Sequence, residues 1–200
     1  MRNERTHNDR REDIIRAALA TFGEKGIINT KIEEVAAEAG IGKGTVYEYF
    51  RSKEEMISAA IRYEMEDLAV QVKSRMDSGQ TVKAKLDAII ETILLHHQQY
   101  RRSQVDIGSA ITAGGGFEEL KALYTEQNGL WLTWLEEIVA DGVETGEIRQ
   151  VDPQLLLGAL TGAVMNLLQP WGTPDWEGTY SPAEAASQIT ELFFEGIKKA

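Results

Sequence analysis

The chain has 200 residues, a net charge of −11 and no cysteine, which excludes a disulfide framework and a thiolate metal site or nucleophile. Its length is sufficient to bury a core, in one domain or in two small ones. Residues 1–20 lack the apolar centre of a signal peptide, and the longest nearly apolar run, residues 155–168, is shorter than the roughly 20 residues of a spanning helix. We therefore expect a soluble, cytoplasmic protein with no membrane contact.

The acidic excess is confined to one part of the chain. Residues 1–62 hold 11 Lys and Arg against 11 Asp and Glu, whereas residues 63–200 hold 10 against 21. A negative total is unusual for a nucleic-acid binder, but the first segment is neutral. The asymmetry predicts two parts with different tasks, although acidic helix surfaces can also serve solubility alone.

The periodicity of apolar residues predicts helices nearly throughout the chain. In the first helix, apolar residues recur at four-residue spacing over residues 14–22, and Gly26 can close it in a left-handed conformation. Thr30 and Glu33 are expected to form a capping box at the start of a short second helix, which ends at Gly40. Two helices with a short connection are thus expected near the start of the chain.

A tight turn, residues 40–42, separates the second helix from a third. The third helix is expected over residues 43–50, with Val46 and Phe50 facing inward. A capping box that begins at Ser52 then starts a long fourth helix. The sequence therefore predicts three short helices that lead into a long one.

Residues 40–44, GIGKG, raise the alternative of a phosphate-binding glycine loop. Such a loop follows a strand, and its nucleotide-triphosphate version requires G-x-x-x-x-G-K-[ST]. Here a capped helix precedes the glycines, and their spacing is G-x-G-x-G, which favours a helix-turn-helix whose second helix enters the DNA major groove. Gly42 and Gly44 would leave no side chain between the backbone and the DNA phosphates.

Four short motifs over residues 14–55 form a set. They are A-A-x-x-x-F-x-x-x-G from Ala17, V-A-x-x-A-G from Val35, K-G-T-V-Y-x-Y-F from Lys43 and S-K-E-E from Ser52, and a threonine, Thr30, opens the second helix. In this order they resemble the N-terminal domain of the tetracycline-repressor (TetR) family of bacterial transcription regulators. The resemblance covers about the first 60 residues, while the remaining 140 are similar only in helical character and length.

The resemblance implies an all-α architecture in two domains. Residues 1–55 would form a helix-turn-helix domain of three helices, and residues 56–200 a larger helical domain that binds an effector and dimerises. The implied function is that of a homodimeric repressor, bound to a palindromic double-stranded DNA operator and released by a small molecule. No enzyme activity, cofactor or metal is expected. A DNA-bound adaptor that recruits a protein through its acidic domain and a helical enzyme remain alternatives.

Carried over residue by residue, the family's DNA contacts fall on the second, third and fourth helices. The positions are Thr30, Lys31, Gly42, Lys43, Gly44, Thr45, Tyr47, Tyr49 and Lys53. The lysines can neutralise phosphates and the threonine hydroxyls can donate hydrogen bonds to them, while either tyrosine can instead be partly core. Glu48 departs from this chemistry because a carboxylate repels phosphate. It either faces away, accepts from a cytosine amino group or pairs with a nearby base.

The remaining helices are predicted from caps and breaks. The fourth runs to about residue 79, and others are expected at residues 82–101, from 103 to a break at 113–117, then to about 144, at 153–169 and from 182 onward. The break, AGGGF, carries three consecutive glycines that a helix cannot hold cheaply. Proline after Asp152 and after Ser181 marks the first turns of the last two helices.

The last two helices predict a dimer interface. Gly158 and Gly162 stand four residues apart and allow a close approach of another helix, and Ile189 and Phe193 belong to a broad apolar face. Two such helices from each subunit can form a four-helix bundle. Packing of the two glycines within one chain is the alternative.

A small hydrophobic or cationic effector is expected in a pocket with aromatic walls inside the acidic domain. The candidate lining residues are Ile93, His97, Trp131, Trp134 and Met165. His97 is interpreted as a core or pocket-lining histidine, with a metal ligand as the alternative, and the tryptophans can also be ordinary core. The adjacent pair His96 and His97 is a poor metal chelate, because neighbours on a helix point to different sides.

Overall fold

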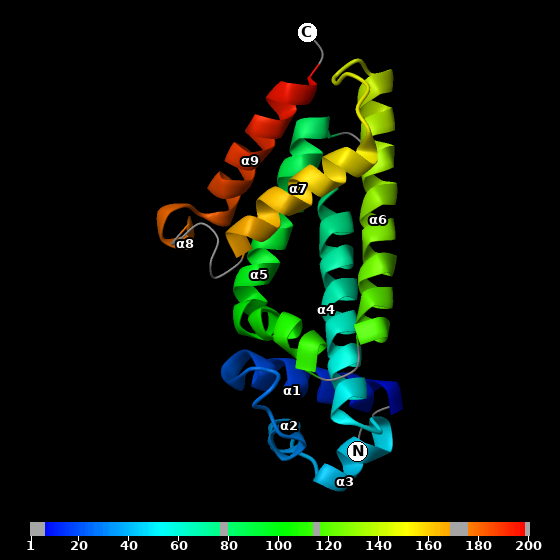
Figure 1. The fold of residues 1–200 in the computed structure, drawn as a ribbon, viewed down its shortest axis with the longest axis vertical. Coiled ribbons are helices and arrows are strands. Elements are labelled where there is room, and N and C mark those ends of the chain that lie inside the picture. Colours follow the sequence, from blue (N-terminus) through cyan, green and yellow to red (C-terminus); the bar gives the residue numbers. More distant parts are fainter. Residues whose placement is uncertain (1–6, 77–79, 114–116, 169–175, 199–200) are drawn as a thin grey trace, which may run out of the picture. The chain divides into compact units, whose positions relative to one another are not determined.

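A computed structural model describes residues 7–76, 80–113, 117–168 and 176–198. Its helices are α1 (His7–Lys25), α2 (Ile32–Glu38), α3 (Lys43–Tyr49), α4 (Lys53–Arg75), α5 (Val82–Ala113), α6 (Phe117–Glu144), α7 (Pro153–Leu168), α8 (Trp176–Thr179) and α9 (Pro182–Ile197) (Figure 1). The described residues add one isolated antiparallel bridge, between Ile148 and Lys198. The predicted all-α class is confirmed.

The chain divides into two compact units. The first unit comprises Met1–Glu66 and Tyr100–Leu123, and the second comprises Asp67–Gln99 and Tyr124–Ala200. The expected boundary after residue 55 differs from this division. Helix α4 continues without a break from Lys53 to Arg75 and contributes residues to both units.

The first unit is built on an apolar core shared by α1 to α4. Phe22 of α1, Val35 of α2, Val46 of α3 and Met56 of α4 are all fully buried in it. Burial of each such side chain contributes about 1.5–3 kcal/mol. Phe50, which ends α3, is buried beside them, so the predicted inward orientation of Val46 and Phe50 is confirmed.

Two glycines stop the first two helices, as predicted. Gly26, after α1, has φ 80°, and Gly40, after α2, has φ 66°. Only glycine adopts this left-handed region without a steric penalty. The chain thereby reverses sharply after each helix, which lets α2 pack on α1 and α3 pack on α2.

The predicted cap of α2 is wrong by one residue. Lys31, not Thr30, is the N-cap, and its backbone N–H donates to the carboxylate of Glu34 at 2.8 Å. Glu33 instead lies in the first turn with its side chain free to reach another helix. The shift arises because the Thr30 side chain points into the core of the first unit.

The second unit packs α5, α6, α7 and α9 around another apolar core. Leu86 and Leu94 of α5, Ile138 of α6 and Val164 of α7 are buried there with Ala186 of α9. In Figure 1, α7 is drawn in yellow and α9 in red. The predicted starts of both helices are confirmed by their caps: Asp152 accepts from the first turn of α7, and Ser181 and Glu184 form a capping box on α9.

One predicted helix start in the middle of the chain is wrong, and one short helix was missed. A new helix was expected near Ser103, but α5 runs unbroken from Val82 to Ala113. A single residue typical of caps is a weak signal for a helix boundary, and α5 continues through Ser103. The short helix α8 was not predicted. The three glycines at 114–116 lie outside the described residues.

Candidate nucleic-acid interface

The turn between α2 and α3 has the backbone geometry that the glycine motif predicted. The N–H of Ile41 donates to the carbonyl of Ala36 at 2.9 Å, and the N–H of Gly40 donates to that of Ala37 at 3.1 Å. These bonds satisfy the last carbonyls of α2 around the left-handed Gly40. Gly42 then caps α3 in an extended conformation. The two helices are thus joined as a helix-turn-helix.

One face of α3 is exposed, and four residues form it. Lys43, Gly44, Tyr47 and Glu48 are exposed, whereas Val46 on the opposite side is buried. A Cβ built on Gly44 would meet no atom within 4 Å. The exposed face therefore presents a cation, a phenol, a carboxylate and bare backbone, and Glu48 shares it with Gly44, one helical turn earlier.

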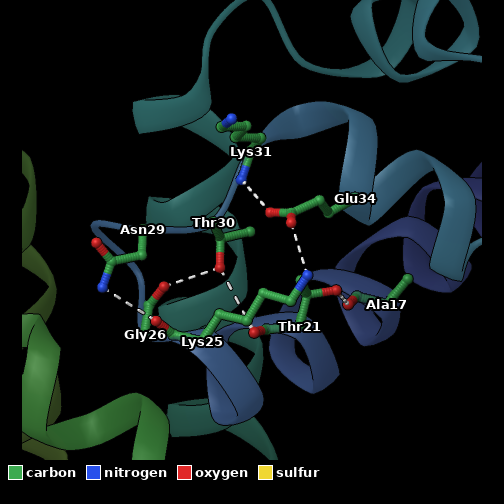
Figure 2. Close-up of polar contacts among 8 residues, drawn as sticks. All are labelled: Ala17, Thr21, Lys25, Gly26, Asn29, Thr30, Lys31 and Glu34. Atoms are coloured by element: carbon green, nitrogen blue, oxygen red, sulfur yellow. Dashed lines mark hydrogen bonds and ion pairs between the residues drawn. The ribbon is translucent and has the colours of Figure 1, made fainter.

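Thr30 does not belong to this exposed surface. Its side chain is 2% exposed, and its hydroxyl donates to the carbonyl of Gly26 at 2.8 Å and to that of Thr21 at 3.5 Å (Figure 2). Its N–H also donates to Gly26, at 3.2 Å. The prediction that this hydroxyl contacts DNA is corrected: Thr30 fixes the connection from α1 to α2, and the exposed Lys31 follows it.

The lysines near the turn make internal contacts. Lys43 on α3 forms an ion pair with Glu33 on α2, with 2.6 Å between Nζ and Oε1. Lys25 pairs with Glu34 at the same distance (Figure 2). Lys53 donates from Nζ to the carbonyl of Ile28 at 3.0 Å, and burial lowers the pKa of Lys53.

The ion pairs also shift the pKa values of the residues that form them. The hydrogen bond from Lys43 holds the pKa of Glu33 below its ordinary value, and the same bond raises the pKa of Lys43. A hydrogen bond from Lys25 lowers the pKa of Glu34, with help from the N–H of Lys31. All these groups are therefore charged at neutral pH.

The two tyrosines of α3 have different surroundings. Tyr47 is exposed, with Nζ of Lys43 at 5.8 Å from its ring centroid. Tyr49 is half-buried against the core of the first unit, and the ring of His7 lies 4.5 Å from its ring. The alternative of a partly core side chain thus applies to Tyr49. Sequence reasoning missed the contact with His7, because the first turns of α1 are too exposed to show apolar periodicity.

The candidate pocket residues of the second unit do not share one environment. His97 and Trp134 are buried, and the rings of Trp131 and Trp134 meet edge to face with centroids 5.1 Å apart. Ile93 is half-buried against the core. Met165, however, is 41% exposed on the outer face of α7, and its predicted role in lining an effector pocket stays a prediction.

The outer faces of α7 and α9 expose apolar side chains and glycines. Leu155 is 75% exposed and Leu192 is 78% exposed. Gly158 and Gly162 are also exposed, and a Cβ on either would meet nothing within 4 Å, so packing within the chain does not require these glycines. Ile189 and Phe193, the other interface candidates, are half-buried against the core of the second unit.

Comparison with known proteins decides the family. A model described as bacterial regulatory proteins, tetR family, matches residues 14–60, and one described as tetracyclin repressor-like, C-terminal domain, matches residues 79–197. The chain belongs to the TetR family. It is therefore a DNA-binding transcription regulator with a helix-turn-helix, as the motifs over residues 14–55 implied.

Individual relatives of this TetR-family regulator extend over nearly the whole chain. The transcriptional repressor KstR2 of Rhodococcus jostii is 31% identical over 192 residues, which cover 94% of this chain and 91% of the relative. The fatty acid metabolism regulator protein of Bacillus subtilis is 23% identical, with coverage of 92% and 93%. Both are similar to this protein across the two units.

Solved structures share the fold. The structure of FadR from Bacillus subtilis in complex with stearoyl-CoA has a TM-score of 0.73 at 21% identity and covers 93% of this chain and 98% of its own. FadR from Bacillus halodurans has a TM-score of 0.74 at 20% identity, with coverage of 95% and 97%. Within the described part of this chain, no helix is long and apolar enough to cross a membrane, and no group of three metal-binding side chains occurs.

Proposed function

We propose that this TetR-family regulator is a homodimeric repressor that binds a palindromic operator through α3 and leaves it when a hydrophobic effector binds. The observation that carries the proposal is the exposed face of α3, where Lys43 and Tyr47 flank bare backbone at Gly44. This combination suits close approach to phosphates and base edges. Lys31, Gly42, Thr45, Tyr49 and Lys53 are proposed as further contacts. A relative 31% identical is named a transcriptional repressor, which supports repression.

The proposed dimer forms through α7 and α9. Leu155, Gly158, Gly162 and Met165 follow one another at spacings of three, four and three, which places them on one stripe of α7. On α9, the large apolar side chain that is exposed is Leu192. Glycines on such a stripe allow a second helix to approach closely, and the bundle would cover apolar side chains that water otherwise contacts. A two-fold dimer would present two α3 helices to a palindrome.

The proposed effector is a molecule with a large apolar part, and a long-chain acyl thioester is the first class to test. The support is the apolar and aromatic surroundings of Trp131, Trp134 and Ile93 in the second unit. A structure with the same fold contains stearoyl-CoA, and another is titled a ketosteroid transcriptional regulator. A cationic effector is less favoured, since Nζ of Lys73 already lies 5.7 Å from the Trp134 ring.

The proposed switch uses α4, which is continuous from the first unit into the second. An effector releases DNA only if it binds the DNA-incompetent arrangement better than the competent one. Typical coupling free energies of about 1–3 kcal/mol correspond to changes of roughly 5- to 150-fold in DNA affinity.

Genome-wide capture of bound DNA fragments, followed by titration of acyl thioesters, tests the proposal. We expect one palindromic sequence among the fragments, and a thioester that changes tryptophan fluorescence and lowers operator affinity in the same samples. Compounds that change the fluorescence but leave operator affinity within twofold would contradict the switch.

A protein that copurifies while no ligand has an effect would favour the adaptor, and turnover that survives Lys43→Ala would favour an enzyme. The proposed location is the cytoplasm, with the chromosome.

A further inference from the structure

The ion pair between Lys43 and Glu33 joins the two helices of the helix-turn-helix. Its 2.6 Å contact runs from the first residue of α3 to the first turn of α2. Both side chains are about half exposed, so the pair lies at the surface and open to an approaching anion. The ammonium assigned to a DNA phosphate is thus already held by a carboxylate of the same protein.

A phosphate and the Glu33 carboxylate compete for the same cation. If Lys43 turns to the phosphate, Glu33 is left without its partner beside polyanionic DNA. If the ammonium holds both anions, which its three donors permit, it brings two negative groups together. Either arrangement lowers the net gain from the contact between Lys43 and DNA.

We propose that Glu33 is an internal competitor that weakens the binding of Lys43 to DNA, an inference that rests on the proposed operator contact of α3. Glu33 subtracts affinity from every DNA sequence, because phosphates carry no sequence information. The remaining contacts of α3, which include those to base edges, then supply a larger share of the total affinity. Glu33 therefore sets the overall strength of DNA binding, and it leaves the difference in affinity between operator and other sequences unchanged.

The other acidic residues of α2 differ from Glu33. Glu34 accepts from the N–H of Lys31 and from Lys25, so it caps the helix and stabilises the fold. Glu38 is exposed near the end of α2, and the described residues offer it no ion pair. Glu38 is therefore the matched control: it carries the same charge on the same helix without contacting Lys43.

The test compares Glu33→Gln with Glu38→Gln in the full-length protein. Equilibrium affinities are measured for an operator fragment and for a scrambled fragment of the same length. Since exposed ion pairs are worth a fraction of a kilocalorie to about one, we expect Glu33→Gln to tighten binding to both fragments about two- to fivefold, and Glu38→Gln to tighten it less. The gain should shrink as salt rises from about 50 to 200 mM, because the competition is between exposed charges.

Repeating both substitutions in a Lys43→Ala background separates competition from plain repulsion. Without Lys43, Glu33→Gln can only relieve repulsion between its carboxylate and DNA, so we expect its gain to fall to that of Glu38→Gln. An equal gain from Glu33→Gln in both backgrounds would overturn the proposal. Unchanged affinity of Glu33→Gln in the wild-type background would overturn it as well. Loss of the proposed function looks different: the wild-type protein itself would then fail to select any DNA fragment.

Discussion

At the scale of single residues, we predict that buried His96 makes the stability of the second unit depend on pH. Burial lowers the pKa of this histidine, against an opposing effect of the Asp67 carboxylate. The folded-state pKa thus lies below the unfolded value of about 6.5, so the unfolded chain binds more protons between the two. Stability should therefore fall as pH is lowered through about 6.5, and it should stop falling on this account below the folded pKa.

We expect His96→Gln to flatten this pH dependence. Urea unfolding at several pH values between about 7 and 5 measures it. His7→Gln, at an exposed position in the first unit, is the control and should keep the wild-type slope. An unchanged slope in His96→Gln would show that carboxylates, not this histidine, control stability over the range.

Thr30 and Thr45 separate a structural hydroxyl from one proposed to contact DNA. Thr30→Val removes the bond to Gly26 and should destabilise the protein by about 1 kcal/mol, with operator affinity within twofold once the protein is folded. Thr45→Val, at a half-buried position on α3, should lower operator affinity and leave the stability of the protein nearly unchanged. Thermal unfolding and operator binding of both variants decide the matter, and the opposite pattern would restore Thr30 as a DNA contact.

Sequence patterns located the turn between α2 and α3 but did not show where the side chains near it point. Threonine is a good cap and a good donor to phosphate, and nothing local distinguishes these roles from the inward position that Thr30 takes. Met165 is a similar case. Its apolar character fits both an interior pocket and an exposed interface, and only the packing of α7 in three dimensions distinguishes them.

At the scale of elements, two glycines of the helix-turn-helix have different physical tasks. Gly40 has a positive φ, so Gly40→Ala should destabilise the protein by about 1–2 kcal/mol. Gly44 lies in α3, where a Cβ has open space. Gly44→Ala should stabilise the free protein by up to about 1 kcal/mol and still weaken operator binding, because its methyl group would face the DNA in the proposed complex.

Denaturant unfolding and DNA titration of the two variants measure these effects separately. A stabilised Gly44→Ala protein with full operator affinity would place the DNA on a surface other than the exposed face of α3. The contrast is useful because destabilisation cannot explain a loss of affinity in a variant that is more stable than the parent.

Element boundaries were predictable where the chemistry is unambiguous. Gly26 and Gly40 take left-handed conformations, and prolines open α7 and α9. The prediction failed at Ser103, because its side chain is compatible with a helix interior and long-range packing decides whether α5 continues. It failed also at α8, a helix of four residues that is too short to show any periodicity.

At the scale of the whole molecule, the exposed stripe on α7 and α9 predicts the oligomeric state. Gly158→Leu adds bulk to the proposed bundle, and Leu192→Asp places a charge in it at a cost of several kcal/mol. Both should convert the dimer into monomer or aggregate. Ser187→Asp puts the same charge on α9 five residues away, on another side of the helix, and should leave the dimer intact.

Light scattering at several concentrations measures the assembly. An intact dimer in both Gly158→Leu and Leu192→Asp would place the interface elsewhere. The sequence alone indicated these helices through Gly158 and Gly162, but not that Leu155 and Leu192 would be the more exposed apolar side chains. That distinction depends on which faces the core of the second unit already covers.

The DNA-binding role of α3 is tested most directly by the operator affinity of Lys43→Ala beside that of Lys83→Ala. Lys83 is a cation of the second unit that pairs with Asp87, so the two variants lose the same charge from different units. Neutralising one phosphate contact is worth several-fold in affinity near 0.1 M salt. We predict that Lys43→Ala weakens binding about fivefold for operator and scrambled DNA alike, and that Lys83→Ala binds as the wild type does. Equal affinities in all three proteins would contradict the assignment of α3 as the DNA-reading helix.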